Sequence, residues 1–161
     1  MNIVFQDLPK DYREFESLAS EMMESPLHTV ALFLLAYLCF EGNPDESMRM
    51  MNLLKGDCPL KRREIIFLKN ADKTKAYLAR SYFIGAAAGN HYQLVRPLTL
   101  DIKPDRAPPS LEGMQKVYVR NEGSASDRIV TVRRRGGKYF IWDYSNLLVD
   151  VKDPDEPDDW E

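Results

Sequence analysis

The sequence is poor in the residue types that most often carry out chemistry. It has only two cysteines and two histidines among 161 residues. Two cysteines are too few for the disulfide framework of a small secreted domain. Cys39 and Cys58 also lack the paired partners of a zinc site. We therefore expect a protein of a reducing compartment, the cytoplasm, with no metal and no cofactor.

The sequence also has no apolar run long enough to cross a membrane. Its most apolar stretch, residues 27–40, contains no Asp, Glu, Lys or Arg and lies between Glu24 and Glu41. As a helix it would span roughly 21 Å, short of the ~30 Å core of a bilayer. The first twelve residues have neither the basic start nor the apolar stretch of a signal peptide. We expect no membrane association, and residues 27–40 should form the buried core helix of a small domain.

The sequence lacks the common motifs that indicate an enzyme. It has no phosphate-binding loop, no dinucleotide fingerprint and no nucleophile elbow. His28 lies at the start of an apolar helix, where a packed or capping role is expected. His91, in the stretch GNHY, is the better candidate for an acid or base because loops carry functional groups on rigid scaffolds.

The net charge of −3 gives no global field for nucleic acid or membranes. The charges are nevertheless uneven, with an excess of bases over residues 61–100 and of acids over residues 145–161. We expect these regions to neutralise each other in the fold. The length suits one domain, over residues 1–152. Residues 153–161, rich in acids and proline, should form a flexible tail.

Four helices are expected in the first half of the chain. The first begins at the N-cap Asp11 and shows three-to-four spacing of apolar residues. Ser25-Pro26 starts the core helix, and Asn43-Pro44 caps the next helix, which ends at Gly56. The fourth helix should cover residues 59–69, with Phe67 and Leu68 on its inner face.

The second half reads as strands. Residues 115–120 alternate, and Gly136-Gly137 is a two-residue hairpin signal between residues 128–135 and 138–144. That turn predicts pairs whose residue numbers sum to 273, such as Arg133 with Phe140 and Thr131 with Trp142. Helices first and strands afterwards indicate an α+β fold, with about four N-terminal helices packed against a C-terminal antiparallel meander.

Two further segments are expected at the margins of the sheet. Residues 2–8 could form a short edge strand or an arm. Residues 93–102 read as an edge strand or a bulged strand, because Pro97 has no N–H to donate to a ladder. An exposed edge can pair with a second copy of the chain, so one expected partner is another copy, in a homo-oligomer formed through residues 93–102.

The run Arg133-Arg134-Arg135 alternates between the two faces of its strand, so it cannot form one patch. Arg133 should lie beside Phe140 and near Trp142. A basic and aromatic strand surface could bind single-stranded nucleic acid, a more general anion or peptide, or simply form a cation–π pair on a solvated hairpin. Nucleic acid is the least favoured of these, because the chain is acidic overall.

Four parts of the sequence are distinctive: the stretch from Arg80-Ser81-Tyr82-Phe83 to Gly85-Ala86, Asn90 and Tyr92, the start MNIVFQDLPK, the LLKG of residues 53–56 and the closing GKYFIWDYSNLLVDVK. Together they resemble a family of small uncharacterised proteins from gut-associated Firmicutes, a domain of unknown function. The resemblance covers nearly the whole chain. It implies a bacterial α+β protein and no established activity. It also directs attention to residues 80–92, as either a site or a junction between the helical half and the sheet.

Two functions therefore stay open. The first is a non-enzymatic cytoplasmic module that binds a small molecule or a protein. Its ligand would meet one of two groups of residues: Arg80, Tyr82, Asn90, His91 and Tyr92, or Arg133, Phe140 and Trp142. The second is a small enzyme with His91 as the acid or base and Arg80 as an anion clamp.

Overall fold

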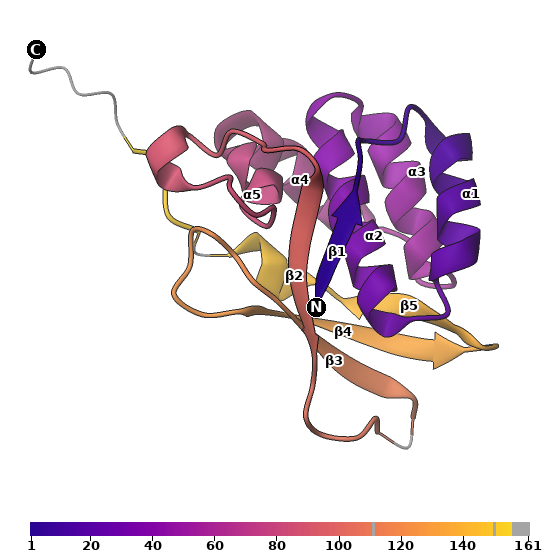
Figure 1. The fold of residues 1–161 in the computed structure, drawn as a ribbon. Helices are drawn as coiled ribbons and strands as arrows, with labels where there is room; N and C mark the ends of the chain where they lie inside the picture. Colours follow the sequence, from indigo (N-terminus) through magenta and orange to yellow (C-terminus); the bar gives the residue numbers. More distant parts are fainter. Residues whose placement is uncertain (111, 150, 156–161) are drawn as a thin grey trace, which may run out of the picture.

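The computed structural model describes residues 1–110, 112–149 and 151–155. Most of the expected acidic tail, residues 156–161, lies outside the described residues. The fold is α+β, as predicted, with helices on one side of an antiparallel sheet (Figure 1). The helices are α1 (Tyr12–Met22), α2 (Pro26–Leu38), α3 (Pro44–Lys55), α4 (Arg62–Lys75) and α5 (Tyr77–Arg80), with short 3-10 helices η1 (Cys39–Glu41), η2 (Ala88–Asn90) and η3 (Ser145–Leu148).

The expected core helix is α2, and it is the hub of the structure. Every residue from Thr29 to Leu38 is buried. The helix packs against α1, α3 and α5 on one side and against β2, β3, β4 and β5 on the other. This explains why its apolar residues run all the way around the helix. Within the described residues, no helix is both long and apolar enough to cross a membrane.

Local capping chemistry sets where the helices begin. The side chains of Asp11, Ser25 and Asn43 accept hydrogen bonds from backbone N–H groups three residues further on, at 3.0, 3.3 and 3.2 Å. Each bond satisfies a donor that the first turn of the helix leaves open. The imidazole of His28 lies 2.9 Å from the Ser25 hydroxyl, at the capped end of α2.

The sheet has five antiparallel strands in the order β1-β2-β3-β4-β5: β1 (Asn2–Phe5), β2 (Leu98–Pro104), β3 (Met114–Val119), β4 (Arg128–Arg135) and β5 (Lys138–Asp143). Of the two alternatives for residues 93–102, the edge strand is wrong. The strand begins only after Pro97, and β1 and β3 pair with it on either side. The N-terminal strand occupies the edge instead, so a homo-oligomer through residues 93–102 loses its premise.

The β4–β5 hairpin follows the predicted register near its turn and departs from it further on. Arg135 pairs with Lys138, Arg133 with Phe140 and Val132 with Ile141, as expected. Beyond these pairs a bulge shifts the register, so Thr131 pairs with Asp143 rather than Trp142. A bulge re-aims the side chains around it, and here it occurs at Trp142, on an outer strand of the sheet.

Candidate functional site

The link between α3 and α4 lies close against β5 because Gly56 has no side chain. Gly56 has a φ of +61°, and a Cβ built there would lie 2.8 Å from Cδ1 of Phe140. Glycine tolerates both this conformation and the close approach. The link is closed by a 2.8 Å hydrogen bond from the Leu60 N–H to the Asn52 side chain. The end of α3 is thereby fixed beside the outer strand of the sheet.

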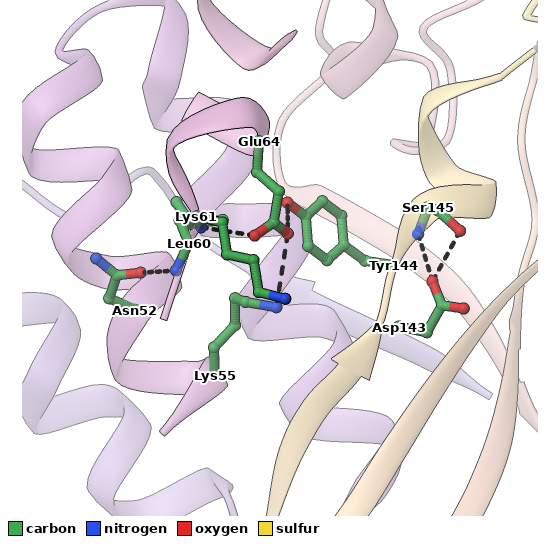
Figure 2. A network of polar contacts seen from close by, with 8 residues as sticks. All are labelled: Asn52, Lys55, Leu60, Lys61, Glu64, Asp143, Tyr144 and Ser145. Carbon is green, nitrogen blue, oxygen red and sulfur yellow. Dashed lines mark hydrogen bonds and ion pairs between the residues drawn. The ribbon is translucent and has the colours of Figure 1, made fainter. Parts of the chain in front are cut away.

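A polar network ties α3, α4 and the end of β5 together (Figure 2). The Tyr144 hydroxyl donates to Glu64 Oε1 at 2.8 Å, and the Lys61 N–H donates to Glu64 Oε2 at 2.6 Å. Lys55 Nζ lies 3.9 Å from Glu64 Oε1 and 4.9 Å from the centre of the Tyr144 ring. The Lys55 side chain is only 5% exposed. Groups from three separate elements therefore hold Tyr144 and the start of α4 in one geometry.

The network shifts the pKa values of its charged members. Burial opposes ionisation of Glu64, but the hydrogen bonds from Lys61 and Tyr144 and the charge of Lys55 outweigh it, so the pKa of Glu64 lies below its ordinary value. Burial lowers the pKa of Lys55, against the opposing charge of Glu64. The charged form of Glu64 is thus favoured by its contacts. The charged form of the buried Lys55 is disfavoured by burial and depends on Glu64 for its stabilisation.

Two adjoining hollows lie on either side of Trp142, and we call them together the Trp142 groove. The apolar hollow has a volume of about 510 Å³ and is lined by Arg63, Glu64, Phe67, Trp142, Asp143, Tyr144, Ser145, Leu148 and Val149. The basic hollow has a volume of about 340 Å³ and is lined by Lys55, Gly56, Asp57, Cys58, Arg133, Arg135, Phe140, Ile141 and Trp142. Trp142 is a wall of both.

Large apolar side chains are exposed along the apolar hollow. Phe67 is 49% exposed, Trp142 45% and Val149 41%. The Arg133 guanidinium lies 5.2 Å from the centre of the Trp142 ring, within cation–π range. A cluster of exposed apolar groups beside a hollow is a feature of binding surfaces.

The structure brings together one of the two predicted groups of site residues. Arg133, Phe140 and Trp142 all line the basic hollow. Lys55 and Phe67 also line the groove, but the sequence did not predict them as site residues. Phe67 and Leu68 were both expected on the inner face of α4, but only Leu68 is buried and Phe67 is exposed. Two members of the Ile65–Leu68 apolar run, Ile66 and Phe67, face outward, and the charged residues on either side of the run are the signal in the sequence that could have indicated this.

The other predicted group is spread over several structural contacts. The buried Tyr82 hydroxyl donates to the Leu147 carbonyl, and the Tyr92 hydroxyl donates to the Lys152 carbonyl. Asn90 closes its own loop through a 2.7 Å bond to the Gly85 carbonyl. Arg80 Nε lies 3.4 Å from Glu41 Oε2. His91 is exposed in a left-handed conformation with φ of 58°.

These contacts give residues 77–92 a definite role in the fold. The Tyr77 hydroxyl donates to Asp153 at 2.5 Å, and the Tyr77 and Tyr92 rings stack with centres 5.1 Å apart. Three tyrosine hydroxyls thus donate to Leu147, Lys152 and Asp153. Leu147 directly precedes Leu148 and Val149, which line the apolar hollow. Tyr82 therefore fixes the residue next to one wall of the Trp142 groove.

The described residues contain no group of three or more histidine, cysteine, aspartate or glutamate side chains placed to hold a metal ion. The thiols of Cys39 and Cys58 are both free. Burial raises the pKa of Cys39 to about 11. Cys58 is exposed and lines the basic hollow. Besides this thiol, the groove presents cations, carboxylates, aromatic rings and aliphatic side chains.

Comparison with known proteins places the chain in a family. No curated protein and no solved structure matches it. Residues 7–155 match the family described as Domain of unknown function (DUF6935). This match takes in every helix and every strand except β1, and it includes the whole Trp142 groove. The chain therefore belongs to this family, a domain of unknown function.

Proposed function

We propose that this protein is a non-enzymatic binding module, and that its ligand, a small molecule or a short segment of another protein, lies in the Trp142 groove. The observation that carries the proposal is that two hollows of different chemistry share Trp142 as a wall. Each has a volume of the order of a ligand site, roughly 300–1,000 Å³. A groove with one apolar and one basic part can bind and orient a ligand at the same time.

The support beneath the groove favours binding as well. Tyr144 is fixed by Glu64, and its ring lies 4.9 Å from the ring of Phe33 in the core helix. Gly56 lets the α3–α4 link pack directly on Phe140. A binding surface on a rigid support loses less entropy when the ligand arrives. The exposed Trp142 and Phe67 are the kind of aromatic anchor that dominates binding energy.

The setting that we propose for this module is the cytoplasm of a bacterium. The two free cysteines agree with a reducing compartment. The resemblance of residues 80–92 and 137–152 to bacterial proteins supports the same setting.

Removal of the Trp142 side chain is expected to abolish ligand binding while leaving the protein folded. A fragment library of neutral, anionic and cationic aromatic compounds would be screened by thermal shift against the wild type. A ligand that binds only the native state at about 100 times its dissociation constant adds ~2.7 kcal/mol of stability. Compounds that stabilise the wild type should give no shift with Trp142→Ala or Phe67→Ala.

The matched control is Val4→Ala, which removes an apolar side chain of similar exposure, 48%, on β1. This variant should keep every stabilising compound. The proposal fails if no compound stabilises the wild type, or if the compounds that do so stabilise Trp142→Ala equally.

A further inference from the structure

Resting on the proposed function, we infer that the ligand is an organic anion. Its aromatic or aliphatic body occupies the apolar hollow, and its carboxylate or phosphate group lies in the basic hollow. The inference follows from which charged side chains of the groove are already satisfied and which are not.

The carboxylates on the groove are engaged within the protein. Glu64 accepts hydrogen bonds from Lys61 and Tyr144. Asp143 accepts from the Ser145 N–H at 2.9 Å and from the Ser145 hydroxyl at 2.7 Å. Asp57 is paired with Arg135. A cationic ligand would therefore compete with these internal contacts for the carboxylates.

The cations are less fully matched. Within the residues that the structure describes, Arg133 makes no ion pair, and its guanidinium is held beside Trp142 where the two hollows meet. Lys55 and Arg135 line the same hollow, but they are already paired with Glu64 and Asp57. Arg63, also without an ion pair in the described part of the chain, lines the apolar hollow. Guanidinium groups suit carboxylates and phosphates because they can donate two parallel hydrogen bonds.

The apolar hollow supplies the other half of the recognition. Phe67, Leu148 and Val149 surround it, and the Trp142 ring continues it toward Arg133. An aromatic or aliphatic body would cover the exposed surfaces of Phe67 and Trp142 and remove them from water. A simple inorganic anion would leave this surface exposed. The groove therefore favours molecules that carry both an apolar part and an anionic group.

The test uses four compounds that share a phenylethyl group and differ in the polar group attached to it: 3-phenylpropanoate, 2-phenylethyl phosphate, 3-phenylpropylammonium and 3-phenylpropan-1-ol. The chain has two tryptophans, so Trp160→Phe leaves Trp142 as the only indole. Its indole N–H signal in a nitrogen-15 NMR spectrum reports binding at the groove directly. Ligands of this size bind with dissociation constants of about 1 mM or below when they fit, and inorganic phosphate serves as the probe without an apolar part.

At least one of the two anions should bind about tenfold more tightly than the alcohol and the ammonium compound. The Arg133→Gln change should remove most of that advantage and leave the alcohol within about twofold. Arg134→Gln is the control, because it removes the same charge from the neighbouring residue, which is absent from the basic hollow. Comparison of the carboxylate with the phosphate tells which anionic group the hollow prefers.

The inference is overturned if neither anion binds more tightly than the alcohol, if the ammonium compound binds best, or if Arg134→Gln weakens the anions as much as Arg133→Gln. It is also overturned if inorganic phosphate alone binds as tightly as the two organic anions. In any of these cases the proposed function is judged separately. Neutral or cationic fragments that lose their thermal shift in Trp142→Ala would keep the binding module while changing the class of its ligand.

Discussion

Replacing Phe33 by alanine is expected to cost about 3–5 kcal/mol of unfolding free energy, the range for a phenylalanine removed from a packed core. Phe33 is 1% exposed in α2, and its ring contacts Tyr144. The change leaves a cavity between the hub helix and the residue that supports the groove. For a domain of this length, such a loss lowers the melting temperature by roughly 10 °C. Denaturant unfolding and calorimetry would measure it.

The same substitution should also loosen the groove. Phe33→Leu is the matched control, because it keeps most of the volume and should cost less than about 2 kcal/mol. The near-ultraviolet circular dichroism signal of the tyrosines should change in Phe33→Ala and stay close to wild type in Phe33→Leu. If both variants unfold at the wild-type denaturant concentration, Phe33 is not the link between the core and the site.

The second large effect is expected at Glu64, with an asymmetry between it and its partner Lys55. Glu64→Gln removes the charge that faces the buried Lys55 ammonium and should cost about 2–3 kcal/mol, since an unmatched buried charge is expensive. Lys55→Met removes the buried charge itself and should stay within about 1 kcal/mol of the wild type. The exposed Arg96–Asp7 pair, at 3.1 Å, provides the surface control. Its loss in Arg96→Gln should cost no more than about 1 kcal/mol.

The Glu64 effect should depend on pH in a defined direction. The pKa of Glu64 is lowered in the folded protein from its ordinary value of 4.5. The folded state therefore binds fewer protons than the unfolded state around that pH, and the stabilisation is present above it and lost as the pH falls. The difference in stability between the wild type and Glu64→Gln should shrink from about pH 6 to about pH 3. A difference that grew on acidification would contradict this assignment.

The parts of the fold that could be predicted are those decided by neighbours in the sequence. Ser25-Pro26 and Asn43-Pro44 set the starts of α2 and α3. The side chains of Ser25 and Asn43 accept hydrogen bonds from backbone N–H groups three residues further on. Gly136-Gly137 fixed the register of the pairs next to the turn, such as Arg133 with Phe140. Such local signals act whatever the rest of the chain does.

The predictions that were wrong concern parts of the fold that depend on residues distant in the sequence. Strand β2 becomes an interior strand because β1, almost a hundred residues earlier, pairs with residues 98–101, as Ile3 does with Leu100, while β3 pairs with residues 102–104. Nothing in residues 93–102 records that partner. The bulge that displaces Trp142 from Thr131 lies beyond the pairs next to the turn, so the two glycines do not predict it.

The candidate site shows the same division. The sequence placed Arg133 beside Phe140 and near Trp142, because strand pairing follows from the hairpin. Lys55, Glu64 and Tyr144 come from three elements and meet only in the folded protein. Tyr82 and Tyr92 were predicted to meet a ligand, but their hydroxyl groups donate hydrogen bonds to the backbone carbonyls of Leu147 and Lys152. A glycine-bearing loop can be polar for structural reasons, and sequence alone does not separate the two uses.

The central claim is that the ligand binds across Trp142 rather than at the loop of residues 80–92. Hydrogen–deuterium exchange with the most stabilising compound of the fragment screen tests it most directly, because peptides over both regions are followed in one experiment. We predict slower exchange in peptides covering residues 55–68 and 139–149, and unchanged exchange over residues 80–92. Protection centred on residues 80–92, with none at residues 139–149, would contradict the account.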